Sequence, residues 1–337
     1  LMEPEEAEEV REILSYGEDT AGRLMNRDVA ALRRQWTIDE AFDYLRSLDE
    51  VETVHYLYVV DRNEVLIGVV PIRNLLLAKQ NRTIDDIMLR SVFSIQADAD
   101  QEELAEFVAR YDYVAIPVVD EKDRLIGVVT VDDVMDALEE EVTEDIQRLG
   151  GSEPLEQPYF SASLTRVVGA RVGWLMLLFV AAIMTGAVLQ FYEAELQTVI
   201  ALSFFIPLVT GTGGNAGSQT VATIIRAITL GEVSVSTLGR AWQREVTVGL
   251  FLGLAMGVMG LILGSIWGVG VDVAMVVAFT LPIVVMCATT IATIVPTLAT
   301  RFGIDPTIIS GPMISTIVDT AGLSIYFSIA KLLIDVI

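Results

Sequence analysis

A glycine-rich polar stretch inside an apolar segment constrains this chain more than any other feature. It runs from Pro207 to Gln219, reads P-L-V-T-G-T-G-G-N-A-G-S-Q, and lies in an apolar segment near 196–226. Because lipid offers no hydrogen-bond partners, irregular glycine-rich backbone survives at membrane depth only where it is buried in protein or lines water. The proline and the glycines favour a broken helix, which presents backbone dipoles to an ion or solute.

Four further apolar segments lie near 167–190, 245–269, 273–300 and 306–335. All five exceed the roughly 20 residues that cross the hydrocarbon core, so we predict five transmembrane helices. Basic residues gather at one set of segment ends, whereas the loops 190–197 and 268–273 carry only acids; the basic residues are Arg166, Arg171, Arg226, Arg240, Arg244 and Arg301. The positive-inside rule then places the N-terminal half in the cytoplasm and the C-terminus outside, in a multi-pass protein of the inner (plasma) membrane.

Asp319 is a second polar anomaly, within I-S-T-I-V-D-T-A-G-L of the last apolar segment. An ionisable residue at membrane depth marks a functional site by default. A two-fold dimer would bring two copies of Asp319 and of the Asn215 stretch around one axis. Such an oxygen-only ring favours a hard divalent cation, and Mg²⁺ would keep its waters there. The alternative is a packing residue bonded to Thr316 or Thr320.

Charge is distributed unevenly along the chain. Residues 1–165 hold 38 of the 46 acidic and 15 of the 22 basic residues, so an acidic soluble half precedes a nearly uncharged membrane half. Nucleic acid is excluded as a partner, because phosphate binding needs clustered Lys and Arg. Dense carboxylates suit Mg²⁺ or Ca²⁺, although solubility alone also explains them. A lone cysteine, Cys287, and a lone histidine, His55, exclude a disulfide framework and disfavour a soft-metal site.

The soluble half contains an internal repeat with an offset of 59 residues. V-V-D recurs at 59–61 and 118–120, and L-I-G-V-V recurs at 66–70 and 125–129, each time after an amphipathic helix and a β-branched strand. This repeat resembles a tandem CBS pair, an α/β regulatory module, over residues 20–141. The resemblance implies an adenine-nucleotide site, with ATP as the candidate ligand, at Thr130 and Asp133 of G-V-V-T-V-D-D. The first copy has Pro71 and Asn74 there and lacks both residues. Thr130 as a simple helix cap is the alternative.

An amphipathic helix is predicted from Val131 to Leu149, before the Gly150-Gly151 break. Eight carboxylates occupy its polar faces: Asp132, Asp133, Asp136, Glu139, Glu140, Glu141, Glu144 and Asp145. A solvated face is the common reason for such a run, and a cation sensor is the other.

The whole arrangement resembles the MgtE family of magnesium channels over residues 17–337. The motifs are P-L-x-x-G-T-G-G-N-x-G-x-Q and the late Asp319-Thr-Ala-Gly322-Leu323. The resemblance implies a multidomain fold: an acidic remnant at 1–16, a tandem CBS pair at 17–138, a connecting plug helix at 139–160 and an all-α channel domain of five transmembrane helices at 161–337.

It further implies a homodimer in the lipid bilayer that holds hydrated Mg²⁺ at Asp319 with Asn215 nearby. Cytosolic Mg²⁺ would close the plug by screening carboxylates, here Asp132, Asp136, Glu139, Glu140 and Glu144. Family members usually begin with a further helical domain, of which only 1–16 is present, so we expect weaker gating by Mg²⁺ than in longer relatives.

Three other functions remain for comparison. A secondary transporter for divalent cations fits a midplane carboxylate as well as a channel does. A nucleotide-using enzyme is disfavoured, because G-T-G-G-N-A-G-S lacks the P-loop lysine and the membrane half has no histidine. A membrane-anchored CBS sensor needs neither Asp319 nor the glycine-rich stretch.

Overall fold

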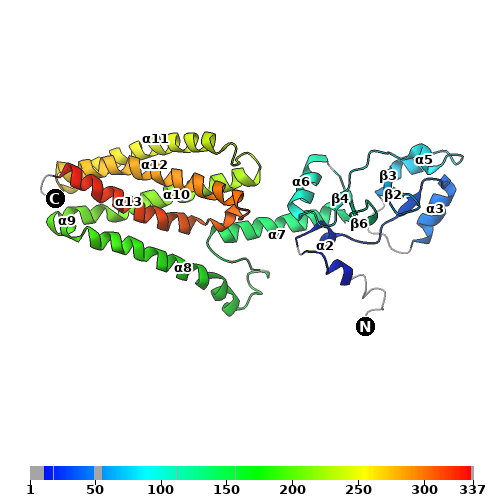
Figure 1. Cartoon of the computed structure of the whole chain (residues 1–337), viewed down its shortest axis with the longest axis horizontal. Helices are drawn as coiled ribbons and strands as arrows, with labels where there is room; N and C mark the ends of the chain where they lie inside the picture. The colour runs from blue at the N-terminus through cyan, green and yellow to red at the C-terminus, as the bar shows by residue number, and fades with distance from the viewer. Residues whose placement is uncertain (1–10, 18, 49–54, 112, 156, 335–337) are drawn as a thin grey trace. The chain divides into compact units, whose positions relative to one another are not determined.

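The computed structural model describes residues 11–17, 19–48, 55–111, 113–155 and 157–334 and divides into two compact units, 1–142 and 143–337 (Figure 1). Most of the predicted acidic helix at 3–16 lies outside the described residues. Each unit has its own buried apolar clusters.

The first unit consists of two similar α/β copies, which confirms the predicted CBS pair. Each copy has a three-stranded sheet in which the first two strands are parallel and the last two antiparallel. The first copy contains α2 (Ala21–Leu24), β1 (Ala31–Arg33), α3 (Ile38–Ser47), β2 (Tyr56–Val60), β3 (Leu66–Pro71) and α4 (Ile72–Leu77). The second contains α5 (Ile84–Ile87), β4 (Ile95–Gln96), α6 (Gln101–Tyr111), β5 (Ala115–Val119) and β6 (Leu125–Thr130).

The 59-residue offset holds down to individual turns. Val59 pairs with Gly68 and Val118 pairs with Gly127, and in each hairpin the register shifts directly after the valine. Each V-V-D aspartate makes an Asx turn: Asp61 Oδ1 accepts from the backbone N–H of residues 63 and 65, and Asp120 Oδ1 accepts from 122 and 124. The repeated tripeptide is therefore explained by the turn that it forms.

Helix α7 (Val131–Leu149) follows the second copy and crosses the boundary between the units. Its predicted bounds are confirmed, but the plug helix expected at 139–160 is wrong beyond Leu149. Gly151 has φ +75° there, in the left-handed region, and Pro154 and Pro158 follow. Because proline cannot donate within a helix and glycine favours such a turn, the chain leaves the helix at this point.

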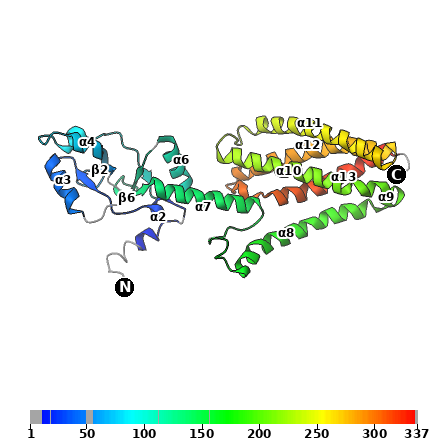
Figure 2. The same ribbon diagram turned by 180° about the vertical axis from the view of Figure 1, so that it is seen from behind.

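The second unit is all-α (Figures 1 and 2). In chain order it contains α8 (Leu164–Phe191), α9 (Glu193–Thr198), the 3₁₀ helix η1 (Ile200–Phe205), α10 (Ile206–Thr229), α11 (Leu238–Trp267), α12 (Val271–Arg301), η2 (Pro306–Ile308) and α13 (Gly311–Leu333). Helix α10 packs against α12 and α13, α11 packs along α12, and α8 packs against α13.

The predicted break in the glycine-rich stretch is wrong, because α10 is a continuous helix through all four of its glycines. Pro207 sits in its first turn, where the missing N–H needs no partner. Gly213, Gly214 and Gly217 are buried, and a Cβ at Gly213 would lie 2.7 Å from Val284 and 2.8 Å from Val318. The glycines therefore bring three helices into close contact, the usual role of small residues in membrane bundles.

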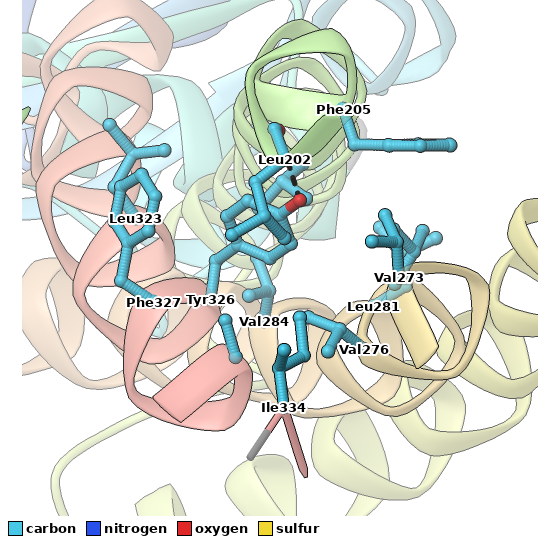
Figure 3. Packing of buried hydrophobic residues seen from close by; sticks show 13 residues of the cluster. Leu202, Phe205, Val273, Val276, Leu281, Val284, Leu323, Tyr326, Phe327 and Ile334 are labelled. Atoms are coloured by element: carbon cyan, nitrogen blue, oxygen red, sulfur yellow. Dashed lines mark hydrogen bonds between the residues drawn. The ribbon is translucent and has the colours of Figure 1, made fainter. Parts of the chain in front are cut away.

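The largest buried cluster lies among η1, α10, α12 and α13. Figure 3 shows Leu202, Val284, Tyr326 and Ile334 from these elements meeting in it. The buried Tyr326 hydroxyl donates a hydrogen bond of 3.0 Å to the Leu202 carbonyl, so the polar atom of this ring is satisfied. This cluster fixes the end of α13 that lies beyond Asp319.

Four helices of the described chain, α8, α11, α12 and α13, are long and apolar enough to cross a membrane. Helix α10 has 24 residues, but its glycines and polar side chains keep it outside this group. The second unit is therefore a helical domain with several apolar helices.

Candidate functional site

A seam of small polar residues joins α10 to α13 beside Asp319. Gly311, Ser315 and Asp319 follow one another at four-residue spacing on α13, so they share a face. Ser315 Oγ donates to the Gly214 carbonyl at 3.2 Å and lies 3.0 Å from Ser218 Oγ, which in turn contacts the Gly311 carbonyl at 3.3 Å. The tertiary structure thus brings together Asp319 and the glycine-rich stretch, two features more than 100 residues apart.

The Asp319 carboxylate is half-buried in this seam. Within the described parts of the chain it has no hydrogen-bond or ion-pair partner. A Cβ at Gly214 would lie 3.7 Å from its Oδ1, so the glycine leaves the carboxylate room. The alternative partners are engaged elsewhere: Thr316 donates to the Pro312 carbonyl, and Thr320 bonds to the Thr316 carbonyl and to Thr185. Hydrogen bonding to Thr316 or Thr320, the packing alternative for Asp319, is therefore not observed.

Asn215 is the next residue along α10 and is exposed. Gly211, Asn215 and Gln219 are all exposed at four-residue spacing and form one polar face of the helix. A Cβ at Gly211 would meet nothing within 4 Å, which leaves the face open. In lipid such amide groups would lack partners, so this face requires water or a second chain.

One copy of the chain does not complete a metal centre. Among the described residues, no three His, Cys, Asp or Glu side chains are close enough to hold an ion. Asp319 supplies a single carboxylate, and Asn215 is an exposed amide on α10. Mg²⁺ prefers six oxygen ligands and keeps several waters, so the donor chemistry fits the ion although the set is incomplete.

In the CBS pair, Thr130 and Asp133 cap α7 and bond to each other. Thr130 Oγ1 donates to Asp133 Oδ2 at 2.5 Å, and the Thr130 N–H donates to the same oxygen at 3.2 Å. The Asp133 N–H in turn donates to Thr130 Oγ1 at 3.5 Å, so the capping alternative is observed. Asp133 also lines a pocket of about 390 Å³ together with Met25, Asn26, Arg27 and Asp28, whereas Thr130 does not. Arg27 is the basic residue of this pocket, and its guanidinium is paired with Glu12 at 2.5 Å.

A second, aromatic pocket in the CBS pair escaped the sequence reasoning. Tyr56, Phe93 and Tyr113 line it, with ring centroids 6.2 Å apart for Tyr56 and Tyr113. Its volume of about 20 Å³ is too small for a nucleobase unless side chains move. Tyr56 begins β2, whereas Phe93 and Tyr113 lie in connecting segments, so only the folding of the chain brings the three rings together.

The predicted regulatory carboxylates lie on α7 with different surroundings. Four of them, Asp132, Asp136, Glu139 and Glu140, are exposed. Glu144 is half-buried and pairs with Arg148 at 2.7 Å. Arg148 also reaches Asp305, in the segment before α13, at 3.1 Å. Within the second unit, the end of α7 is thus linked to the segment before α13 by an ion-pair network.

Asp145 lies within electrostatic range of Asp305, an acid that the sequence did not single out. Burial, followed by the Asp305 carboxylate, raises the pKa of Asp145; Glu144 adds to this, and Arg148 and Arg226 oppose it. Two carboxylates that repel at the end of α7 would be relieved by a proton or a cation. The sequence signal for this pair was Asp305, an acidic residue between Arg301 and Pro306 at the end of the apolar segments where arginines gather.

Comparisons with known proteins agree with this architecture. A family model described as a divalent cation transporter, MgtE, matches residues 206–329, and a CBS domain model matches 21–81 and 84–140. The magnesium transporter MgtE of Thermus thermophilus is 38% identical and aligns with 100% of this chain and 75% of its own length. The Bacillus subtilis MgtE is 35% identical, over 98% of this chain and 73% of its own.

Solved structures similar to part of this chain include the cytosolic domain of the Mg²⁺ channel MgtE in complex with ATP. It is 41% identical, covers 40% of this chain and 54% of that one, and has a TM-score of 0.39. The soluble part of a magnesium transporter is 37% identical, covers 42% and 55%, and has a TM-score of 0.41. The curated relatives are transporters, which confirms that this chain is not an enzyme. By its sequence similarity over nearly the whole chain, the protein belongs to the MgtE family of magnesium transporters.

Proposed function

We propose that the protein is a channel that admits hydrated Mg²⁺ across the inner membrane, and that Asp319 is its ion-binding residue. The observation that carries this proposal is the half-buried Asp319 carboxylate without a protein partner, set in a seam of glycine and serine. A carboxylate there attracts a divalent cation and accepts hydrogen bonds from its waters, so the ion need not be fully dehydrated.

The functional molecule in this proposal is a homodimer in the bilayer. One chain supplies one carboxylate and one exposed polar face of α10, with Gly211, Asn215 and Gln219. A two-fold axis beside this face would double the ligands and remove the amides from lipid. Helix α10 then becomes the fifth membrane span, because neighbouring helices and the second chain keep its polar groups away from lipid.

The proposed orientation has the CBS pair in the cytoplasm and the C-terminus outside. Six arginines lie at one set of ends of the apolar segments, as the positive-inside rule requires of the inner face. They are Arg166, Arg171, Arg226, Arg240, Arg244 and Arg301. Lys331, near the other end of α13, is the exception, and it pairs with Glu195 at 2.7 Å. The pairing neutralises a cation that would otherwise repel Mg²⁺ at the outer face.

The decisive experiment is divalent flux into proteoliposomes with the wild type, Asp319→Ala and Asp319→Asn. Asp272→Asn is the matched control, because Asp272 is an exposed acid at the start of α12. We expect both Asp319 variants to lose Mg²⁺ flux and Asp272→Asn to retain it. Unitary currents from the same membranes identify a channel, and flux without them would replace the proposal by a carrier. Equal flux in all four proteins would remove Asp319 from the pathway.

Gating by cytosolic Mg²⁺ is the second part of the proposal. Bound cations would offset repulsion among the carboxylates of α7 and favour a closed arrangement, and linkage requires that closure raise Mg²⁺ affinity equally. Asp132, Asp136, Glu139, Glu140 and Glu144 are the proposed sensors, and Asp145 with Asp305 extends the set. Modulation by ATP would act through the pocket at Asp133 and Arg27.

The gating test neutralises Asp136, Glu140 and Glu144 together and measures flux against internal Mg²⁺. Asp39→Asn with Asp43→Asn is the control, since these exposed acids on α3 change the charge elsewhere. Loss of Mg²⁺ inhibition only in the α7 variant supports the assignment. Unchanged inhibition in that variant, or equal loss in the control, contradicts it.

A further inference from the structure

The turn that follows α7 packs directly on Trp174 of α8. Gly151 has φ +75°, and a Cβ there would lie 2.6 Å from Cδ1 and 2.7 Å from Nε1 of Trp174. Two residues after Gly151, the Glu153 N–H donates to the carbonyl of Ala170, one helical turn before Trp174, at 2.9 Å. The backbone of 151–153 therefore lies against α8 with no side chain between the glycine and the indole.

The same indole bonds to the residue that begins α13. Trp174 Nε1 donates to Ser310 Oγ at 3.0 Å, and that oxygen also accepts the Met313 N–H at 3.3 Å as the N-cap of α13. Ser310 is fully buried, so water does not replace either donor. A single hydroxyl thus links α8 to the first turn of the helix that carries Asp319.

Two other contacts hold the end of α7 at the same place. Arg148 pairs with Asp305, which caps the short helix η2 before Ser310. The Leu149 carbonyl would lie 3.8 Å from a Cβ at Gly311, the first residue of α13. Asp319 follows eight residues later in an unbroken helix, roughly 12 Å along the axis at 1.5 Å per residue. A shift of the first turn is therefore carried to the carboxylate.

We propose that Trp174 is a positioning residue, which couples the turn at 150–153 to the first turn of α13 and so sets the position of Asp319. The proposal rests on the proposed function, in which Asp319 holds the ion. Trp174 touches neither the ion nor its ligands. Through the Ser310 hydroxyl, Trp174 couples movement of the connecting segment to movement of α13, the helix that carries Asp319.

The direct test is hydrogen exchange of the full chain in nanodiscs, with Trp174→Phe, Ser310→Ala and the double variant. Trp174→Phe keeps an aromatic ring but removes the donor. Trp242→Phe is the matched control, because Trp242 Nε1 donates to Thr290 Oγ1 at 3.2 Å between α11 and α12, away from this junction. We expect the first-turn amides of α13 to exchange roughly fivefold faster in Trp174→Phe, the factor that loss of one neutral hydrogen bond produces. The double variant should exchange no faster than Ser310→Ala. Unchanged exchange in Trp174→Phe, or the same increase in Trp242→Phe, overturns the proposal.

The functional test measures flux against internal Mg²⁺ for Gly151→Ala and Trp174→Phe. Gly231→Ala is the control for backbone strain, because Gly231 has φ +70° but no neighbour within 4 Å of a Cβ. We expect the two junction variants to shift the half-inhibiting Mg²⁺ concentration severalfold while flux at low Mg²⁺ is retained, and Gly231→Ala to shift nothing. Equal shifts in all three variants overturn the coupling. If internal Mg²⁺ does not inhibit flux in the wild type, the proposed gating is contradicted. The hydrogen-exchange experiment then still tests whether Trp174 couples the turn to α13.

Discussion

Replacing Gly213 by alanine tests the packing of α10 most sharply. An alanine Cβ would lie 2.7 Å from Val284 Cγ1 and 2.8 Å from Val318 Cγ1, closer than real Cβ contacts come. Both valines are fully buried and β-branched, so neither can rotate away without moving its helix. Overpacking of this kind costs about 3 kcal/mol, the upper part of the observed range.

The intrinsic helix preference acts in the opposite direction. Alanine is favoured over glycine by about 1 kcal/mol inside a helix. The net loss of unfolding free energy for Gly213→Ala is then about 2 kcal/mol. Gly211 lies in the same helix with nothing within 4 Å of its Cβ position, so Gly211→Ala should gain about 1 kcal/mol. The two variants should differ by about 3 kcal/mol.

Reversible unfolding in mixed micelles, titrated with a denaturing detergent, measures this difference. Gly186→Ala serves as a reference outside α10, since Gly186 in α8 also has no neighbours. Equal stability of Gly213→Ala and Gly211→Ala would refute the close packing. Destabilisation by Gly211→Ala, with Gly186→Ala stable, would indicate that the backbone there is not a regular helix.

The remaining predictions concern α7. Ionised Asp145 disfavours the folded contact because its pKa is raised by burial and by Asp305, so stability falls as pH rises above the unfolded value of about 4. Asp145→Asn should therefore be more stable than the wild type at pH 7, and the advantage should vanish near pH 4 in a melting series; an equal advantage at both pH values would contradict this cause. Thr130→Val should lower stability by about 1 kcal/mol through loss of the helix cap, yet leave ATP affinity of the full chain unchanged. Asp133→Asn should weaken ATP binding in the same titration, and weaker binding in Tyr113→Ala instead would move the nucleotide to the aromatic pocket.

Several features of this protein were readable from local sequence. The 59-residue repeat predicted two equivalent hairpins, because each V-V-D aspartate makes the same Asx turn through its own backbone. The end of α7 at Leu149 followed from Gly150-Gly151, which is also a local effect. Apolar segment lengths indicated membrane helices without any knowledge of their neighbours, because the solvent alone sets that requirement.

The glycine-rich stretch shows where local reasoning stops. A missing Cβ permits both a helix break and a close helix contact, and the sequence 207–219 does not distinguish between them. Val284 and Val318, 71 and 105 residues after Gly213, decide the outcome, because they occupy the space that a side chain would fill. The sequence likewise did not predict whether Asp319 has a hydrogen-bond partner, since Thr316 and Thr320 lie close to it along the helix. In the structure both threonines bond to backbone carbonyls instead.

The sequence by itself determined the repeated hairpins of the CBS pair and the apolar helices, because turn formation and hydrophobic length act over a few neighbouring residues. Only the tertiary structure decided that α10 is continuous, that Asp305 lies close enough to Asp145 to raise its pKa, and that Trp174 bonds to the cap of α13. Each of these depends on side chains brought together from helices far apart in the chain. Contacts of that kind follow from how the helices pack, which no local pattern records.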